Sequence, residues 1–197
     1  MLNGILTPAF LQAAGRAGKG GEQIIELARS AKTPEGYGMG VICTYNGTII
    51  VESTYNGQQE IKEFSSPTAP SNINSDENTP IYFKGDITLI EQDAGQILSC
   101  DTFNSKKIET IHLRGQGFLK TLKIGNSVQT IDLSGSTAIA EIYYSGKNEA
   151  VATSIAQAIA SSSEAHGTVY TDSTSEYYST IATAATAKGW TIAQLPA

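Results

Sequence analysis

Few residues in this chain have the types and spacing that catalysis needs. The segment GRAGKGGEQ around Lys19 has too short a spacing for a phosphate-binding loop, and glycine follows the lysine where Ser or Thr would hold the metal. Gly38 and Gly40 lack the third glycine of a dinucleotide site. The histidines, His112 and His166, are not paired at metal spacing, and the chain has no GxSxG motif. We therefore expect no enzyme, no cofactor and no metal. Scattered carboxylates leave open an enzyme that acts on glycans.

Composition and charge narrow the class further. The 197 residues are 40% hydrophobic and 16% charged, which is typical of a globular protein, and a net charge of −6 argues against a general nucleic-acid binder. Cys43 and Cys100 can form at most one bridge and do not make a CxxC pair, so we expect buried or idle thiols. No apolar run reaches the ~18 residues of a membrane span, and the N-terminus is a poor signal peptide.

The residues best placed for recognition lie in a periodic region. The spacing apolar-x-x-apolar-x-apolar recurs from Ile108, Leu119, Val128 and Ile139, with weaker copies from 87 and 97. Alternate copies begin 20 or 21 residues apart, as from 108 to 128 and from 87 to 108. This period predicts a solenoid in which two small parallel ladders face each other.

Between the buried positions, the period predicts side chains that point outward in pairs. His112 and Asp132 should lie one coil apart on one side, and Lys123 and Tyr143 on the other. The candidate interaction residues are Thr110, His112, Lys123, Thr130, Asp132 and Tyr143. Two interpretations stay open, a solvated ladder of β-forming residues and a shallow polar surface that recognises a sugar or a protein.

The segment before the periodic region must position it, and its sequence contains patterns typical of helices, of β-turns and of a loop. Thr7 and Pro8 predict the start of one helix, and EQIIELARSAK (22–32) predicts a second. Asn46-Gly47 and Asn56-Gly57, each between β-branched runs, predict two tight turns and a three-stranded meander. The proline-rich segment SSPTAPSNINSDENTP (65–80) reads as a linker or exposed loop.

After the periodic region the chain predicts a covering unit of mixed structure. Asn148 should cap a helix over EAVATSIAQAIASS, and GTVYT should form a strand. Ser173 and Glu176 fit a capping box for a second helix, which Gly189 should end. Trp190 should then plug the core from a final short strand.

The segment VQTIDLSGSTAIAEIYYSGKN resembles one turn of the short leucine-rich repeats of bacterial surface proteins of the Bacteroidetes and Firmicutes type. The matching residues are Val128, Ile131, Asp132, Leu133, Ser134, Ile139 and Ile142. The resemblance covers about residues 81–146, and the closing ATAKGWTI is similar to the terminal caps of such proteins. It departs at Ser136, where the family has a turn-capping Asn, and at Tyr144, which replaces a frequent Cys.

These observations predict an α+β, β-rich protein with a short leucine-rich-repeat-like solenoid. We expect an N-terminal helical arm at 1–36, a three-stranded β-meander at 37–66, a linker at 67–80, the solenoid at 81–146 and a helix-containing cap at 147–197.

The function that these elements favour is non-enzymatic. A repeat typical of surface proteins, in a chain that starts at Met1 without an export signal, favours a virion protein such as a phage head fibre or capsid decoration. Its N-terminal arm would bind capsid proteins, copies of the chain would assemble, with the trimer as the state usual for phage fibres, and the repeats would face a host glycan or protein. The alternative is an adhesin or binding module on the bacterial cell surface.

Overall fold

The computed structural model describes residues 23–31, 34, 38–93 and 95–196. This part of the chain forms eleven strands and two helices. The strands are β1 (Ile24–Arg29), β2 (Ile42–Tyr55), β3 (Gln58–Ser65), β4 (Pro80–Glu91), β5 (Ile97–Asp101), β6 (Thr110–His112), β7 (Thr121–Ile124), β8 (Thr130–Asp132), β9 (Glu141–Tyr144), β10 (Thr168–Thr171) and β11 (Thr191–Gln194). The helices are α1 (Glu149–Ser161) and α2 (Tyr178–Lys188).

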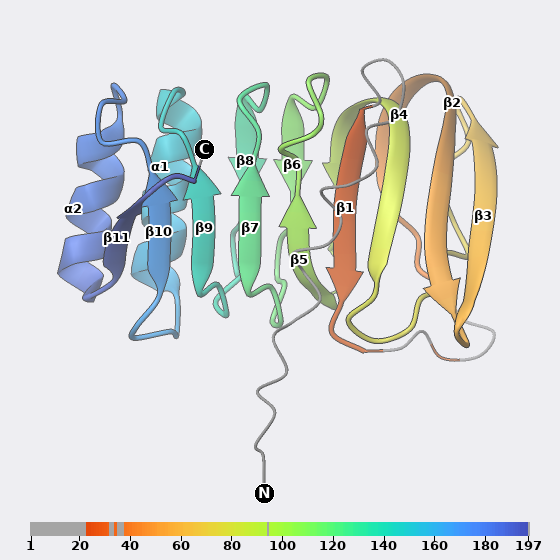
Figure 1. Ribbon diagram of the computed structural model, residues 1–197, viewed down its shortest axis with the longest axis horizontal. Helices are drawn as coiled ribbons and strands as arrows, with labels where there is room; N and C mark the ends of the chain where they lie inside the picture. Colours follow the sequence, from red (N-terminus) through yellow and green to blue (C-terminus); the bar gives the residue numbers. More distant parts are fainter. Residues whose placement is uncertain (1–22, 32–33, 35–37, 94, 197) are drawn as a thin grey trace, which may run out of the picture.

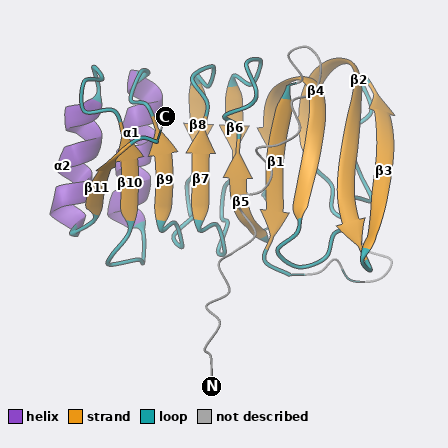
Figure 2. Ribbon diagram, viewed as in Figure 1, coloured by secondary structure: helices purple, strands orange, loops and turns teal. Residues whose placement is uncertain are grey.

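All eleven strands belong to one mixed sheet (Figures 1 and 2). Nine of them follow the order β11-β10-β9-β7-β5-β1-β4-β2-β3, while β6 pairs with β4 and β8 pairs with β6. The antiparallel pairs are β3 with β2, β2 with β4, β4 with β1, and β1 with β5. The later strands add in parallel, as β5-β7-β9-β10-β11 and as β4-β6-β8.

The sheet bends back on itself so that its inner face becomes the core. The first half of β4 pairs with β1, whereas its second half pairs with β6, and Figure 1 places β6 and β8 behind β5 and β7. Ile111 and Ile131 on the rear strands, like Leu122 and Ile142 on the front strands, are almost fully buried. The two helices pack against each other: α1 lies next to β8 and behind β9 and β10, and α2 packs against β10 and β11.

The expected fold class is wrong in its architecture. The described residues form a single bent sheet of eleven strands with two short helices, and among them there is neither a separate meander nor a solenoid. The buried positions of the repeats do form parallel ladders, but antiparallel β1 and β4 join both ladders and the hairpin into one sheet. A sequence period reports which residues are buried locally and does not report which distant strands complete the sheet.

The second helix of the expected N-terminal arm is also absent, because residues 24–29 form β1. Ile25 and Leu27 point into the core at the strand period of two, and β4 and β5 pair with the two edges of β1. Pairing on both edges outweighs the weak helix preference of the Glu, Leu and Ala in this segment. The expected helix beginning at Thr7 and Pro8 lies outside the described residues.

Of the two expected Asn-Gly turns, only the second joins two strands. Asn56 and Gly57, with φ values of 54° and 71°, connect Tyr55 to Gln58 as a two-residue hairpin. At Asn46-Gly47 the chain continues as β2, and the register against β4 shifts between Asn46 and Ile50. Gly47, at φ 73°, therefore serves a bulge at which the strand bends.

The segment from 66 to 79 packs against the hairpin. Ile73 is buried, and the carboxylate of Asp76 accepts hydrogen bonds from the backbone N–H groups of Asn56 and Gly57 at 3.0 and 2.9 Å. Tyr45 adds a bond from its hydroxyl to the carbonyl oxygen of Thr68. These contacts explain how a proline-rich, largely polar segment stays ordered on the sheet.

The helices and the buried tryptophan expected after residue 147 are present, and one expected helix cap is not. The side chain of Asn148 caps α1 by accepting from the N–H of Val151 at 3.1 Å, and Gly189 ends α2 in the left-handed conformation. Trp190 is buried, and its Nε1–H donates to the carbonyl of Glu164 at 2.8 Å. The expected capping box is wrong, because α2 starts after Tyr177 with no side-chain cap.

Candidate functional site

The six candidate interaction residues lie on two opposite outer faces of the molecule. Thr110 pairs with Thr130 and His112 pairs with Asp132 across β6 and β8, as expected from the period. Lys123 pairs with Tyr143 across β7 and β9 on the front face. The face of β4, β6 and β8 that points away from the core is called the back face below, and the opposite outer face of the nine-strand path is called the front face.

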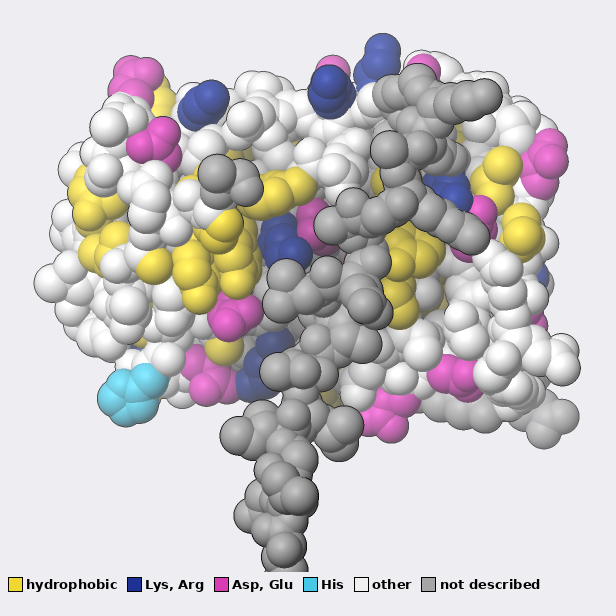
Figure 3. All heavy atoms as spheres, in the orientation of Figure 1, with side chains coloured by type: hydrophobic (Ala, Val, Ile, Leu, Met, Phe, Trp, Pro, Cys, Tyr) yellow, Lys and Arg dark blue, Asp and Glu magenta, His cyan; other side chains and the backbone are white. Residues whose placement is uncertain are grey.

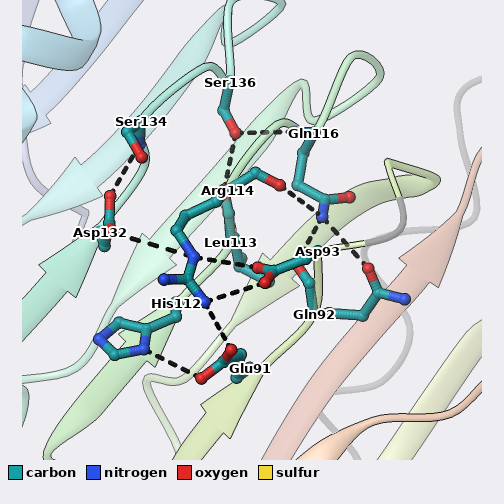
Figure 4. A network of polar contacts seen from close by, with 10 residues as sticks. All are labelled: Glu91, Gln92, Asp93, His112, Leu113, Arg114, Gln116, Asp132, Ser134 and Ser136. Atoms are coloured by element: carbon teal, nitrogen blue, oxygen red, sulfur yellow. Dashed lines mark hydrogen bonds and ion pairs between the residues drawn. The ribbon is translucent and has the colours of Figure 1, made fainter.

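A network of charged side chains covers the back face (Figure 4). Arg114 follows β6, and its guanidinium donates two hydrogen bonds to Asp93 at 3.1 and 2.9 Å and one to Glu91 at 2.5 Å. Asp132 lies 4.0 Å from the same guanidinium. These bonds, that to Asp93 above all, raise the pKa of Arg114, so the arginine remains a cation shared by three carboxylates.

Two further contacts hold the ends of this network. His112 Nδ1 lies 3.2 Å from a carboxylate oxygen of Glu91, so one carboxylate contacts both His112 and Arg114. The backbone N–H of Ser134 donates to Asp132 at 3.0 Å, and hydrogen bonding by Ser134 lowers the pKa of Asp132. Each of the three carboxylates lies within ion-pair distance of Arg114, so the network is internally paired and carries an excess of negative charge.

Buried polar side chains hold the turns that carry this network. Ser136, which stands where the repeat family has Asn, accepts from the N–H of Gln116 at 2.9 Å and donates to the carbonyl of Leu113 at 2.6 Å. Gln116 in turn accepts from the N–H of Ile97 at 3.0 Å and donates to the carbonyl of Gln92 at 2.6 Å. These bonds satisfy buried backbone groups and fix the loop that begins at Arg114.

On the front face, each of the nine strands of the path has one residue that lies directly opposite its counterpart on the next strand. The outward side chains of these nine aligned residues are called the front row below. From edge to edge the front row consists of Ile61, Glu52, Tyr82, Glu26, Asp101, Lys123, Tyr143, Tyr170 and Ala193. The half near β3 is mainly charged, and the half near β11 is aromatic. Figure 3 shows hydrophobic and tyrosine side chains gathered over β9, β10 and β11 on this face.

The aromatic half of the front row is a stack. The rings of Tyr143 and Tyr170 lie 4.2 Å apart between centroids with an interplanar angle of 7°. Lys123 Nζ lies 5.6 Å from the centroid of Tyr143, on the side of β7. The next residue of the row beyond Tyr170 is Ala193, whose side chain is too short to continue the stack itself. A planar or flat apolar group can continue the stack at this position.

The charged half of the front row contains Glu26, whose ionised carboxylate is disfavoured by its surroundings. Burial, followed by the nearby charge of Asp101, raises the pKa of Glu26, while Lys123 acts in the opposite direction. Lys123 Nζ itself lies 3.1 Å from a carboxylate oxygen of Asp101. The lysine thus joins the acidic pair Glu26 and Asp101 to the tyrosine stack.

A polar groove of about 400 Å³ separates β8 from α1 on the back of the molecule. Asp132 and Ser134 line one wall, and Ser154, Gln157 and Ser161 of α1 line the other. The groove therefore offers hydroxyl, amide and carboxylate groups without an aromatic ring among its lining residues.

Sequence reasoning missed the partners of the candidate residues more than the residues themselves. Glu91 is the last residue of β4, Asp93 and Arg114 follow the ends of β4 and β6, and the three meet only because these two strands pair in register. The signal was present, since charged residues recur at the ends of neighbouring repeat strands. Tyr170 was not identified because its strand joins the sheet only after the helix crossover of α1.

The described part of the chain offers few groups for metal binding or thiol chemistry. No group of three or more His, Cys, Asp or Glu residues there has the geometry to hold a metal ion. Cys43 and Cys100 are free thiols, and burial raises the pKa of Cys43 to about 12 and raises that of Cys100 as well. Neither described helix is both long and apolar enough to cross a membrane.

No family model, curated protein or solved structure matches this chain significantly.

Proposed function

We propose that this chain is a non-enzymatic binding protein that uses the aromatic half of its front row to hold a surface glycan. What supports the proposal is one observation, the stack of Tyr143 on Tyr170 that ends beside Ala193. The ring face of Tyr170 on the side of Ala193 offers an apolar plane for the C–H face of a sugar ring. A groove that closes around a substrate is not needed for this mode of binding.

Polar groups beside the Tyr170 ring suit the same ligand. The neighbouring outward position of the same strands carries Glu141, Thr168 and Thr191, next to Tyr143, Tyr170 and Ala193 respectively. Thr191 is exposed, and Glu141 and Thr168 are partly exposed. Two hydroxyls and a carboxylate can make hydrogen bonds to sugar hydroxyls while the ring stacks, which is the usual division between apolar contact and orientation in a binding site.

The setting that we propose is the surface of a phage particle, as a head fibre or capsid decoration, with the bacterial cell surface as the alternative. What supports either setting is the resemblance of the repeat segment to surface-displayed leucine-rich repeats. Capsid proteins and further copies of the chain are the partners that the first setting requires.

Direct binding measurements test the glycan site. Purified protein is passed over a panel of immobilised bacterial surface polysaccharides, and the variants Tyr170→Ala and Ala193→Tyr are compared with the original chain. The first variant removes the Tyr170 ring, and the second fills the space beside it, so both should weaken binding at least about tenfold. Tyr178→Ala, which removes a half-buried tyrosine at the start of α2, should leave binding unchanged.

Two results would reject this site. The first is that no polysaccharide of the panel binds. The second is that a polysaccharide binds with equal affinity to both front-face variants, which would move the site to another surface such as the groove between β8 and α1.

A further inference from the structure

The sheet ends at β3, and this strand has the features of an edge that pairs with a copy of itself. β3 is eight residues long and has β2 as its one paired neighbour in the described part of the chain. Ile61 at its centre is 62% exposed, which is more than any other large hydrophobic side chain among the described residues. A long edge strand with an exposed apolar centre is a template for another strand.

The hairpin fixes which backbone groups of β3 face outward. In a two-residue hairpin the residues that flank the turn, here Tyr55 and Gln58, exchange backbone hydrogen bonds. Alternate residues of β3 from Gln58 onward therefore bond to β2. The N–H and C=O groups of Gln59, Ile61 and Glu63 point to the free edge instead.

We propose that two copies of this chain form a dimer in which their β3 strands pair antiparallel about a two-fold axis at Ile61. In this register Ile61 lies opposite Ile61 of the second copy on the front face. Glu60 lies opposite Lys62 of the second copy, and Lys62 lies opposite its Glu60, so two oppositely charged pairs form on the other face. Gln59 lies opposite Glu63, which brings no like charges together.

The charges select this register over its neighbours. Sliding one strand by two residues in one direction places Glu60 opposite Glu60, and sliding it in the other direction places Lys62 opposite Lys62. Like charges directly opposite each other in a sheet are unfavourable. The order Glu-Ile-Lys at residues 60–62 is therefore self-complementary only when Ile61 lies on the two-fold axis.

The charged side chains can reach a partner strand. Glu60 and Lys62 are 31% and 34% exposed, and they already lie 3.6 Å apart within one copy. Lys62 also donates to the carbonyl of Asn72 in the segment that packs behind β3. The dimer would extend the front row of each copy across the axis, because Ile61 is the first residue of that row. This inference does not depend on the proposed ligand.

Charge-swapped variants provide the test. Glu60→Lys and Lys62→Glu each place like charges opposite one another at both pairs, so each variant alone should raise the dissociation constant of the dimer at least about tenfold. An equimolar mixture of the two variants places opposite charges at both pairs again and should restore a dimer of mixed composition. The matched control is Lys107→Glu, an exposed position outside β3 with the same change of charge.

Sedimentation equilibrium of the full chain is the measurement, with circular dichroism to check that each variant is folded. The original chain should reach twice its mass of 20.8 kDa at a concentration of about 0.1 mM, well above the dissociation constant of an ordinary weak dimer. A monomer or a trimer under these conditions would overturn the proposal. So would a mixture that fails to associate, or a control that weakens the dimer as much as the β3 variants do.

Discussion

Replacing Gln116 with methionine should be one of the most destabilising single changes in the periodic region. Gln116 is fully buried, and its side chain accepts from the N–H of Ile97 and donates to the carbonyl of Gln92. Gln116→Met keeps the length of the side chain and removes these two bonds, together with the longer contacts of Gln116 Nε2 to the side chain of Gln92 and to the carbonyl of Arg114, each at 3.2 Å. The change leaves one buried donor and one buried acceptor without these partners.

The size of the effect follows from those two groups. A buried backbone group that loses its partner costs about 1–3 kcal/mol, so the free energy of unfolding should fall by about 2–6 kcal/mol. With a denaturant slope of about 2 kcal/mol/M, the urea midpoint should fall by about 1–3 M. Urea unfolding followed by circular dichroism measures both quantities.

A control on the surface separates the loss of these bonds from the loss of an amide in general. Gln129 is exposed, donates to the carbonyl of Ser127 at 3.2 Å and accepts from Nδ2 of Asn148 at 2.9 Å; because both bonds are exposed to solvent, Gln129→Met should change the free energy of unfolding by no more than about 0.5 kcal/mol. If Gln116→Met costs less than about 1 kcal/mol, or no more than the control, then Gln116 does not satisfy these buried groups as described.

Three further predictions follow from single residues. Burial raises the pKa of Glu26 in the folded protein, so as the pH rises the unfolded chain loses this proton first and the stability falls between the two pKa values. Glu26→Gln should therefore raise the Tm more near pH 7 than near pH 4. Equal effects at both pH values would contradict this. Gly167→Ala should lower the free energy of unfolding by about 1–3 kcal/mol, measured in urea, because its Cβ would lie 2.4 Å from an atom of the buried Trp190 ring; an unchanged midpoint would show that the ring can move. Cys43 is partly buried, and desolvation raises its pKa to about 12, so it should react with iodoacetamide at pH 8 far more slowly than an ordinary exposed thiol; fast labelling found by mass spectrometry would contradict this raised pKa.

The sequence predicts the periodic strands and their lateral pairs because both depend on local spacing. Leu122 and Ile142 are buried and paired as the period requires, and so are Ile111 and Ile131. The period says nothing of the antiparallel strands that close the sheet. Residues 24–29 look helical in isolation and become β1 only because two distant strands pair with them.

The candidate site divides in the same way. The pairing of His112 with Asp132 and of Lys123 with Tyr143 follows from the repeat, whereas the stack on Tyr170 depends on a strand that joins after a helix of 13 residues. The turn at Asn46-Gly47 failed as a prediction for a related reason. The same dipeptide that closes a hairpin also suits a bulge, and the choice depends on whether a partner strand continues past it.

Surface labelling at the native source tests the account as a binding protein that is displayed outward. Intact phage particles and intact cells are treated with a membrane-impermeant amine reagent, and labelled peptides of this chain are identified by mass spectrometry. The account predicts labelled lysines from this chain on purified particles or, in the alternative setting, on whole cells. Recovery of the chain only from the cell interior, unlabelled until lysis and absent from particles, would contradict it.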